Sequence, residues 1–360
     1  MKTVLVTGAA GFIASKTSEL LLKKGYRVVG VDNMNDYYDV TLKNYRLREL
    51  KKLSASMSSR KTTSKVVPAK AGISGSCFRR NDMREKRGRR CGEFIFHKID
   101  IENMTSCKRI FNKYKFTSVV NLAARAGVRY SLINPHVYLT TNGNGTLNLL
   151  ELCREKGIKK FLLASTSSLY AGQKMPFKES LPVNTPISPY AASKKAAEVM
   201  CYSYHYLYGI DVSIVRYFTV YGPAGRPDMS IFRFIKWIDE GKPIELFGDG
   251  TQSRDFTYVD DIAAGTVKAL RPVGYEIINL GGNKPFKLNY AIKLIEKYLG
   301  KKTKYKYLPF HKADLMATWA NVDKAGKLLK WKAKVGLEEG IKRSVEWYLD
   351  NKSWVSKVKL

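Results

Sequence analysis

The chain has 360 residues, 44% of them hydrophobic, and carries a formal net charge of +32. This length and hydrophobic content exclude a disordered chain and predict a sizeable core in one or two domains. No run approaches eighteen apolar residues, and the opening "MKTVLVTG" lacks the features of a signal peptide, so we expect a cytoplasmic protein that does not enter membranes. The five cysteines show no metal-ligand spacing, which predicts free thiols and no metal site.

The first segment predicts a strand, a glycine turn, a helix and a second strand in "TVLVTG", "AAGFIASKTSELLLKKG" and "YRVVGVD". Gly8, Gly11 and Ala14 form a G-x-x-G-x-x-A pattern between the first strand and the helix. The glycines let backbone N–H groups approach a pyrophosphate, and the small alanine permits close packing of helix and strand. Asp32 ends the second strand, where a carboxylate accepts hydrogen bonds from ribose hydroxyls and repels a 2′-phosphate. This unit therefore predicts NAD binding.

Residues 51–92 differ in composition from their surroundings. They hold 13 Lys and Arg against Asp82 and Glu85, are poor in large apolar residues, and follow a helix-like stretch that ends near Leu50. We interpret residues 51–92 as a basic, disordered insertion. Its charge leaves open a non-enzymatic alternative, polyanion binding through this segment, although we do not expect specific nucleic-acid binding.

Strands and helices alternate again from residue 93. The expected strands are 93–100, 118–124 and 159–166, and the expected helices are 105–115, 136–156 and 188–207. This alternation predicts an α/β fold with a Rossmann-type doubly wound parallel sheet. Residues 1–50 and 93–210 would form this NAD-binding domain.

The C-terminal part, 211–360, is less regular. We expect it to form mainly a smaller α/β domain for the substrate, with some segments returning to the main sheet. "VSIVRYF" predicts a buried strand. The Pro- and Gly-rich stretches 219–229 and 244–261 are expected to be loops that wrap a ligand.

Three further features lie between the first segment and this C-terminal part. Asp100 and Ile101 close the strand that follows the acidic residue of the first unit, where an adenine would lie. "LLAST" is a strand with a Ser/Thr-rich end. Tyr190 and Lys194 stand four positions apart in "SPYAASKKAAE", so they share one face of the expected helix.

The order of these features, a glycine turn, "NLAA", a Ser/Thr strand end and Tyr-x-x-x-Lys, resembles the extended short-chain dehydrogenase/reductase family, with its NAD-dependent epimerases and dehydratases. Over the whole chain except 51–92, stretches such as "AARAGVRYSLINPHVYLTTN" and "RYFTVYGPAGRPDMSIFRF" resemble nucleotide-sugar epimerases, most of all those acting on UDP-glucuronate. The resemblance implies interconversion of UDP-glucuronate and UDP-galacturonate through a 4-keto sugar, with bound NAD as hydride acceptor and donor.

The resemblance also implies a homodimer. Helices near 136–156 and 188–207 would pair with their copies in a four-helix bundle. Aromatic side chains suit such an interface, and the helix offers Tyr202, Tyr204, Tyr206 and Tyr208.

Roles transfer from the family onto matching residues. Tyr190 would be the acid/base, and Lys194 would lower its pKa while binding the nicotinamide ribose. Thr166 would hydrogen-bond the C4 oxygen of the sugar, with Ser167 in reserve, and Arg226 resembles a clamp for the sugar carboxylate. The remaining candidates are Gly8, Gly11, Phe12, Ile13, Asp32, Asp100 and Ile101 for the cofactor, Arg254 and Asp314 for the UDP diphosphate and ribose, and Thr219 and Arg129 for the sugar-nucleotide pocket.

Several alternatives share this fold. A UDP-hexose or UDP-N-acetyl-hexosaminuronate 4-epimerase would use the same residues. A UDP-glucuronate decarboxylase would carry an acid where Ser168 stands, and a 4,6-dehydratase would carry acids at both Ser167 and Ser168, so we favour epimerisation. Two positions depart from the family: Arg125, where relatives often carry glutamine beside the cofactor, and Ala224, where they often carry an aromatic residue.

Overall fold

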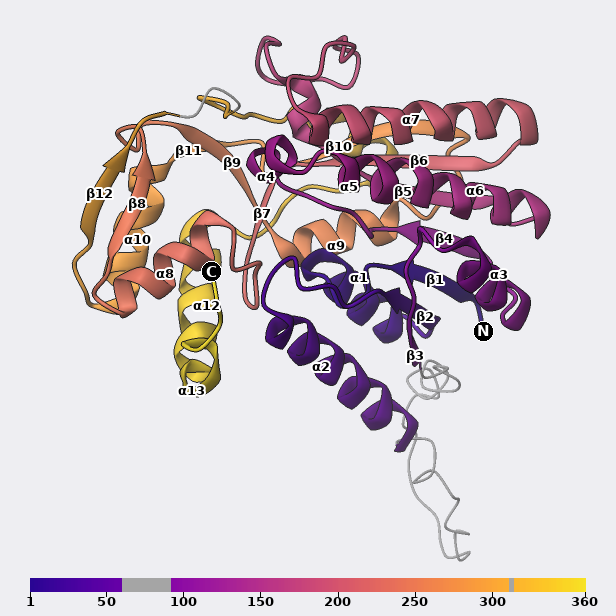
Figure 1. The fold of residues 1–360 in the computed structure, drawn as a ribbon, viewed down its shortest axis with the longest axis horizontal. Helices are drawn as coiled ribbons and strands as arrows, with labels where there is room; N and C mark the ends of the chain where they lie inside the picture. Colours follow the sequence, from indigo (N-terminus) through magenta and orange to yellow (C-terminus); the bar gives the residue numbers. More distant parts are fainter. Residues whose placement is uncertain (60–91, 311–313) are drawn as a thin grey trace, which may run out of the picture.

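A seven-stranded parallel sheet forms the centre of the molecule in the computed structural model, which describes residues 1–59, 92–310 and 314–360 (Figure 1). The strand order is β10-β6-β5-β4-β1-β2-β3. This order confirms the predicted Rossmann-type doubly wound fold. The strands are β1 (Thr3–Thr7), β2 (Arg27–Asp32), β3 (Glu93–Lys98), β4 (Ser118–Asn121), β5 (Lys160–Thr166), β6 (Asp211–Tyr217) and β10 (Tyr275–Leu280).

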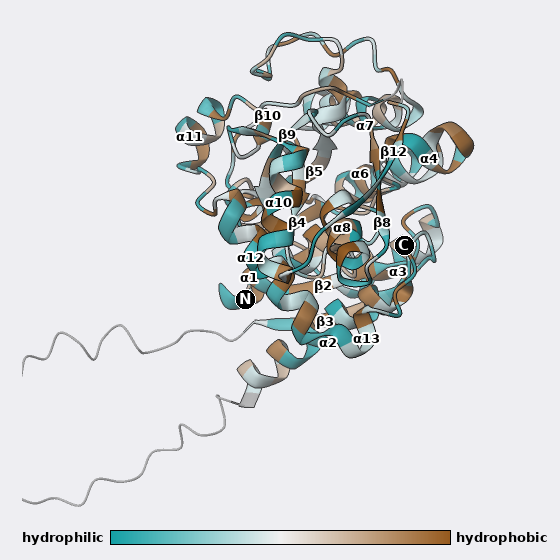
Figure 2. Cartoon of the chain, turned by 90° about the vertical axis from the view of Figure 1, so that its left-hand side faces the viewer, coloured by the Kyte–Doolittle hydropathy of each residue, from teal (hydrophilic) through white to brown (hydrophobic). Residues whose placement is uncertain are grey.

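Helices cover both faces of this sheet (Figures 1 and 2). Leu5 packs into the core under one set of helices, and Val4 and Val6 pack into the core under the other, because successive side chains of a strand point to opposite faces. None of the helices in the described residues has the length and apolarity needed to span a membrane. The first face carries α3 (Met104–Lys113), α6 (Gly145–Glu155) and α7 (Pro189–Tyr208), and the second carries α1 (Phe12–Lys23), α2 (Val40–Ser59), α9 (Val259–Lys268) and α11 (Asp323–Leu329).

Short helical segments complete this part of the chain. Between β4 and α7 lie α4 (Val128–Ile133), α5 (His136–Tyr138), the π-helix η1 (Leu139–Asn144) and the 3₁₀-helix η2 (Ser167–Tyr170). The segments α5, η1 and α6 follow one another without a break, so together they form the long helix expected over 136–156.

A second hydrophobic core lies beside two smaller sheets, ordered β11-β9-β7 and β12-β8. Its buried residues come from both sheets and from the helices around them. The elements are β7 (Thr219–Tyr221), β8 (Pro243–Phe247), β9 (Ser253–Tyr258), β11 (Pro285–Lys287) and β12 (Lys304–Leu308), with α8 (Ser230–Asp239), α10 (Leu288–Leu299), α12 (Leu337–Asp350) and α13 (Lys352–Val355).

The expectation of loops at 219–229 and 244–261 is correct for residues 222–229 and 248–252 and wrong for the rest, where β7, β8, β9 and the start of α9 lie. Ile244, Leu246 and Phe256 are buried in the second core, which favours strands over solvent-exposed loops. Gly248 and Gly250 have φ values of +74° and +80° and form the turn between β8 and β9. Turn residues at the ends of short strands therefore gave these stretches the composition of loops.

The expected start of the insertion at residue 51 is also too early. Helix α2 continues to Ser59, because Leu53 and Met57 pack against the core of the second face. The Ser54 hydroxyl accepts a hydrogen bond from the backbone N–H of Phe94 in β3, at 3.0 Å. Residues 60–91 lie outside the described part of the chain.

Candidate active site

The predicted cofactor residues gather at the point where the strand order of the main sheet reverses. Strand β1 pairs with β2 on one side and with β4 on the other. Open α/β sheets bind ligands in the crevice at the carboxyl ends of strands at such a switch point. The turn after β1 and the turn after β4 approach closely, since a Cβ on Gly8 would lie 2.9 Å from the backbone nitrogen of Ala123.

The glycine turn leaves the start of α1 open to an anion. Gly8 has φ +66°, a left-handed conformation that favours glycine. Gly11 is the N-cap of α1 and provides no side-chain cap, and a Cβ there would lie 2.8 Å from the carbonyl oxygen of Gly8. The first helical turn begins with Phe12 and Ile13 and contains no acidic residue. Its free N–H groups therefore fit the diphosphate of the predicted NAD.

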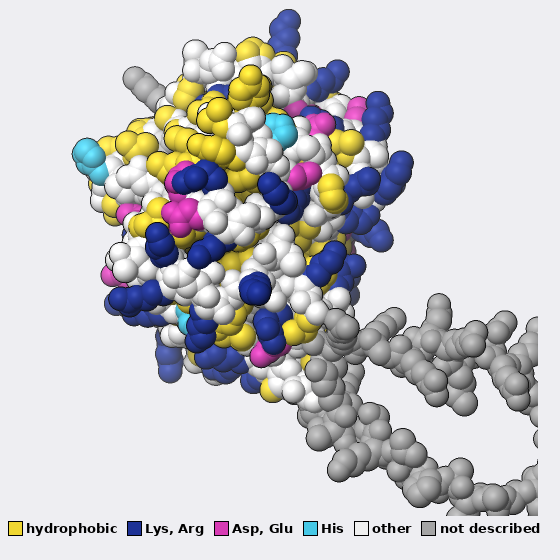
Figure 3. Space-filling view, turned by 90° about the vertical axis from the view of Figure 1, so that its right-hand side faces the viewer, with side chains coloured by type: hydrophobic (Ala, Val, Ile, Leu, Met, Phe, Trp, Pro, Cys, Tyr) yellow, Lys and Arg dark blue, Asp and Glu magenta, His cyan; other side chains and the backbone are white. Residues whose placement is uncertain are grey.

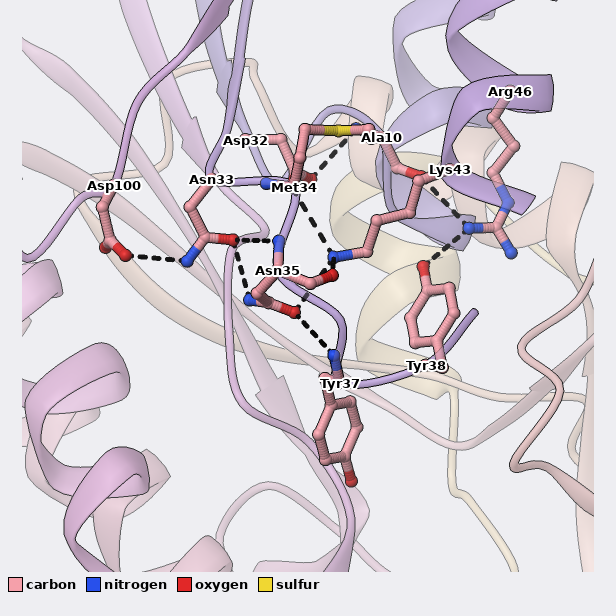
Figure 4. Close-up of polar contacts among 10 residues, drawn as sticks. All are labelled: Ala10, Asp32, Asn33, Met34, Asn35, Tyr37, Tyr38, Lys43, Arg46 and Asp100. Carbon is pink, nitrogen blue, oxygen red and sulfur yellow. Dashed lines mark hydrogen bonds and ion pairs between the residues drawn. The ribbon is translucent and has the colours of Figure 1, made fainter. Parts of the chain in front are cut away.

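Asp32 is held at the end of β2 by backbone donors (Figure 4). Its Oδ1 accepts from the N–H of Met34 at 2.8 Å, and its Oδ2 accepts from the N–H of Ala10 at 3.2 Å. The Lys43 ammonium lies 3.8 Å from Oδ1. A carboxylate has about four lone-pair sites, so Asp32 keeps acceptor capacity for ribose hydroxyls.

Asp100 joins the network around Asp32, whereas Ile101 does not. The Asn33 side-chain amide donates to Asp100 at 2.7 Å, which links the residues that follow β2 and β3 (Figure 4). The Ile101 side chain is instead buried in the core under α3, α6 and α7. A Cβ on Gly145 of α6 would lie 2.6 Å from it. Sequence reasoning missed Asn33, although it follows Asp32 directly.

The start of α7 positions the predicted acid/base. Ser188 is the N-cap of α7, and its hydroxyl accepts from the N–H of Ala191 at 3.2 Å, with proline at the first helical position. This cap places Tyr190 in the first turn and Lys194 one turn later. Thr166, which ends β5, acts on the phenol of Tyr190 and favours its ionised form, so the pKa of Tyr190 is raised less than burial alone would raise it.

Burial dominates the electrostatics of the Tyr190–Lys194 pair. Burial raises the pKa of Tyr190, although Thr166 and the Arg226 charge oppose this shift. Burial lowers the pKa of Lys194 to about 8, and its ammonium donates to the carbonyl oxygen of Ala164 at 2.9 Å. The expected lowering of the Tyr190 pKa by Lys194 is therefore not found in the protein alone. The cation that favours the phenolate is Arg226.

A buried ion pair between Glu198 and Arg216 lies one turn further along α7 than Lys194. Sequence reasoning missed this ion pair. Glu198, one turn after Lys194, accepts from Arg216 Nε at 2.9 Å and Nη2 at 2.7 Å, and from the Ser165 hydroxyl at 2.6 Å. Glu198 and Arg216 are each 1% exposed. The pair ties α7 to β6 and to the end of β5, beside Thr166. An arginine inside the apolar stretch "VSIVRYF" was the available signal, because a buried charge requires a partner.

The predicted carboxylate clamp already holds a carboxylate. Arg226 donates from Nε to Asp228 Oδ1 at 3.0 Å, and its Nη2 pairs with the other oxygen of Asp228. Nη2 also donates to the carbonyl oxygen of Ala126 at 3.3 Å, and the guanidinium lies 5.6 Å from the centre of the Tyr37 ring. Arg226 and Thr219 line one cleft, together with Phe12. A sugar carboxylate would therefore meet a guanidinium whose Nε–Nη2 edge is occupied.

The residues predicted for UDP also meet. Arg129 forms an ion pair with Asp314, and its guanidinium lies 3.6 Å from the centre of the Phe247 ring. Burial lowers the pKa of Arg254. The charge of Asp314 opposes this shift, and the charge of Arg129 adds to it. The chain therefore brings Arg129, Arg254 and Asp314 together from three distant segments.

Arg46 is a positioning residue that sequence reasoning did not find. It lies on α2 and is 3% exposed. Its Nη1 donates to the carbonyl oxygen of Ala10 in the glycine turn at 3.1 Å and to the Tyr38 hydroxyl at 2.7 Å. Its Nη2 donates to the carbonyl oxygens of Ala224 at 2.7 Å and Gly225 at 3.1 Å, just before Arg226. One side chain thus holds the cofactor turn and the clamp loop together.

Residues 4–281 match the model of the NAD dependent epimerase/dehydratase family. The chain is 54% identical over 357 residues to the UDP-glucuronate 4-epimerase of Thermodesulfobacterium geofontis (strain OPF15), a match that covers 99% of each chain. It resembles the crystal structure of UDP-glucuronic acid 4-epimerase from Bacillus cereus in complex with UDP-glucuronic acid and NAD, with 35% identity and a TM-score of 0.80, covering 97% of this chain and 99% of that one. The UDP-glucose 4-epimerase of Thermotoga maritima with UDP-glucose matches with 28% identity and a TM-score of 0.77, covering 97% and 99%.

Proposed function

The chain belongs to the NAD dependent epimerase/dehydratase family, and from this premise we propose that it is a UDP-glucuronate 4-epimerase that uses NAD. It would interconvert UDP-glucuronate and UDP-galacturonate. The observation that carries this proposal is that Tyr190 and Arg226 meet around the neighbouring rings of Tyr138 and Tyr37, with Thr166 also acting on the Tyr190 phenol. Thr166, Tyr190 and Arg226 supply a hydroxyl, an acid/base and a cation, the groups needed to react at C4 of a sugar that carries a carboxylate.

Each of these residues has a task in the reaction. NAD, when bound, supplies the hydride acceptor and donor for C4. Tyr190 takes the proton of the C4 hydroxyl as the C4–H bond breaks, and gives it back when hydride returns to the other face. Thr166 holds the C4 oxygen beside the phenol. Lys194, with a pKa of about 8, keeps most of its charge at neutral pH and favours the phenolate once the site is filled.

Inversion also requires that the 4-keto sugar turn over while its nucleotide stays bound. Arg254 and Arg129 would hold the diphosphate end, where the structure groups them with Asp314. Arg226 would engage the sugar carboxylate, so it favours a uronate over a neutral hexose.

The residues after Thr166 favour epimerisation over the family's other reactions. Ser167 and Ser168 begin η2, and the Thr166 hydroxyl donates to the Ser168 hydroxyl at 3.2 Å. Decarboxylases and 4,6-dehydratases of this family need a carboxylic acid there, and this chain offers hydroxyls. A UDP-hexose or UDP-N-acetyl-hexosaminuronate 4-epimerase remains the second candidate function, because the Asp228 carboxylate occupies Arg226 and could leave the clamp neutral.

Product analysis tests the proposal. The protein is incubated with UDP-glucuronate, and the sugar nucleotides are separated and identified by nuclear magnetic resonance. We expect a mixture of UDP-glucuronate and UDP-galacturonate, with the same mixture reached from either side. A UDP-pentose product would overturn the proposal in favour of decarboxylation, and turnover of UDP-glucose alone would move it to the neutral hexose.

We also propose that the protein is a homodimer. Hydrophobic side chains gather on the side of the molecule where α6 and α7 end (Figure 3). Tyr206 and Leu207, near the end of α7, are 76% and 62% exposed. Tyr204 does not contribute, because it is buried and its hydroxyl bonds to Glu151 of α6. Light scattering should give the dimer mass, and the monomer mass would refute the dimer.

A cytoplasmic location fits this function. Cys107, Cys153 and Cys201 are buried free thiols, which suits a reducing compartment. Burial raises the pKa of the Cys107 thiol to about 12, so it stays protonated and unreactive.

A further inference from the structure

The positively charged guanidinium of Arg125 has no carboxylate partner in the described part of the chain. Its backbone is fixed, because its N–H donates to Asn142 Oδ1 and its carbonyl oxygen accepts from Asn142 Nδ2, both at 3.0 Å. Its Nε is buried without a hydrogen-bond partner, and its guanidinium lies 5.8 Å from the centre of the Tyr37 ring. Among residues 1–59, 92–310 and 314–360, no carboxylate forms an ion pair with it. A buried donor without a partner is unfavourable, so this side chain calls for a ligand.

The position of Arg125 assigns that ligand to the cofactor side of the site. It follows β4, two residues after Ala123, which faces the Gly8 turn. The guanidinium faces the ring of Tyr37, on the segment that follows Asp32, and Arg226 faces the same ring at 5.6 Å. Arg125 also opposes the charged form of Lys43, the lysine beside Asp32. The backbone of Arg125 therefore lies beside the cofactor turn, and its side chain extends toward the residues that follow Asp32.

The local charge balance also fits an anion. Arg125, Arg46 and Arg226 all act on Lys43, and the carboxylates of this network are Asp32, Asp100 and Asp228. Four cations and three carboxylates leave an excess of one positive charge. A dinucleotide diphosphate carries two negative charges, and the open start of α1 lies across the same crevice.

We infer that Arg125 binds the diphosphate of the dinucleotide and adds to the backbone cradle a charge that holds the cofactor in place. The inference rests on the proposed NAD-dependent function. It assigns a cofactor contact to a position where glutamine is common in the family and would supply no charge. The consequence is a cofactor affinity that falls with salt, because a charge-assisted contact is screened.

Binding measurements on the full-length protein test this inference. NAD, ADP-ribose and adenosine are titrated calorimetrically into the unaltered protein, Arg125→Gln, Arg125→Lys and the control Arg109→Gln, which alters an exposed arginine of α3. We expect Arg125→Gln to weaken NAD and ADP-ribose by about tenfold and adenosine by less than twofold, because adenosine has no phosphate. Arg125→Lys should lose less, since it keeps the charge, and Arg109→Gln should lose nothing. Added salt should weaken NAD less in Arg125→Gln than in the unaltered protein.

Three results would overturn the inference. The first is an unchanged NAD affinity in Arg125→Gln. The second is an equal loss for adenosine, which would indicate a distorted site. The third is a loss for UDP-glucuronate with NAD unaffected, which would assign Arg125 to the sugar. Failure of the unaltered protein to bind NAD would instead refute the proposed function, and it would appear before any variant is compared.

Discussion

The cofactor end and the sugar end of the site are built in different ways. At the predicted cofactor end, Asp32 and Ala10 are hydrogen-bonded across 22 positions within one βαβ unit. At the sugar end, Arg129 pairs with Asp314 across 185 positions, and Arg46 reaches Ala224 across 178. A local unit can be recognised from a short motif, whereas a site assembled from distant segments depends on the whole fold.

The two ends also differ in how their charges are satisfied. Arg226 and Arg129 at the sugar end are paired with Asp228 and Asp314. Arg125 at the cofactor end has no such partner in the described residues. We therefore expect the sugar end to exchange one carboxylate for another on binding, while the cofactor end gains a new ion pair. Variants of single residues can separate these two modes.

The largest effect is expected where the two ends meet, at Tyr190. Tyr190→Phe removes the acid/base, so kcat should fall by roughly 10²- to 10⁴-fold on every substrate. NAD affinity should change little. Tyr307→Phe is the matched control, because that tyrosine of β12 is 64% exposed, and its kcat should equal that of the unaltered protein. A Tyr190→Phe variant with near-normal kcat would exclude this phenol as the acid/base.

Arg226→Ala should separate the sugar end from the cofactor end. Loss of a charge-assisted hydrogen bond costs about 1.5–3 kcal/mol, so kcat/KM for UDP-glucuronate should fall roughly 10- to 100-fold. Use of UDP-glucose should fall far less, and NAD affinity should be unchanged. Arg343→Ala, which alters an exposed arginine of α12, serves as the control. Equal losses on both sugars would show that Arg226 does not bind the carboxylate.

The Lys194 ammonium predicts a pH effect on stability. Its pKa is about 8 in the folded protein and near 10.5 in the unfolded chain, so the unfolded chain binds more protons between these values. The free energy of unfolding should therefore rise with pH in this window, by about 1 kcal/mol between pH 8 and 9 from this residue. Urea unfolding of the unaltered protein and Lys194→Met at both pH values measures the difference. A parallel pH dependence in the two proteins would contradict the assignment.

The smallest expected effect is a loss of stability when Arg46, which connects the cofactor end to the sugar end, loses one hydrogen-bond partner. Tyr38→Phe removes one acceptor from Arg46 and leaves its bonds to Ala10 and Ala224. We expect a loss of stability of about 0.5–1.5 kcal/mol, measured by thermal unfolding. KM for UDP-glucuronate should rise no more than a few-fold. A melting temperature equal to that of the unaltered protein would show that the Tyr38 hydroxyl does not support Arg46.

Sequence reasoning placed the glycine turn and Asp32 side by side because both belong to one contiguous stretch of the chain. The spacing of Gly8 and Gly11 and the acidic residue at position 32 follow from the demands of one βαβ unit. The resemblance supplied Thr166, Tyr190 and Arg226. Sequence reasoning missed that Arg226 already holds Asp228, although the two residues stand only two positions apart.

Contacts between distant segments explain what was missed elsewhere. Arg46 acts on carbonyl oxygens, which every residue has, so its partners leave no mark in the sequence. Strands β8 and β9 are short and flank a glycine turn, and their burial depends on helices far along the chain. Local composition therefore indicated loops where tertiary packing forms strands.

The central claim, inversion at C4 by hydride transfer, is tested most directly with UDP-glucuronate that carries deuterium at C4. The protein is incubated with this substrate in ordinary water, and the product is analysed by nuclear magnetic resonance and mass spectrometry. We predict UDP-galacturonate that keeps the deuterium at C4, because the hydride leaves and returns without meeting solvent. Loss of the label to water, or a UDP-pentose in place of UDP-galacturonate, would contradict the claim.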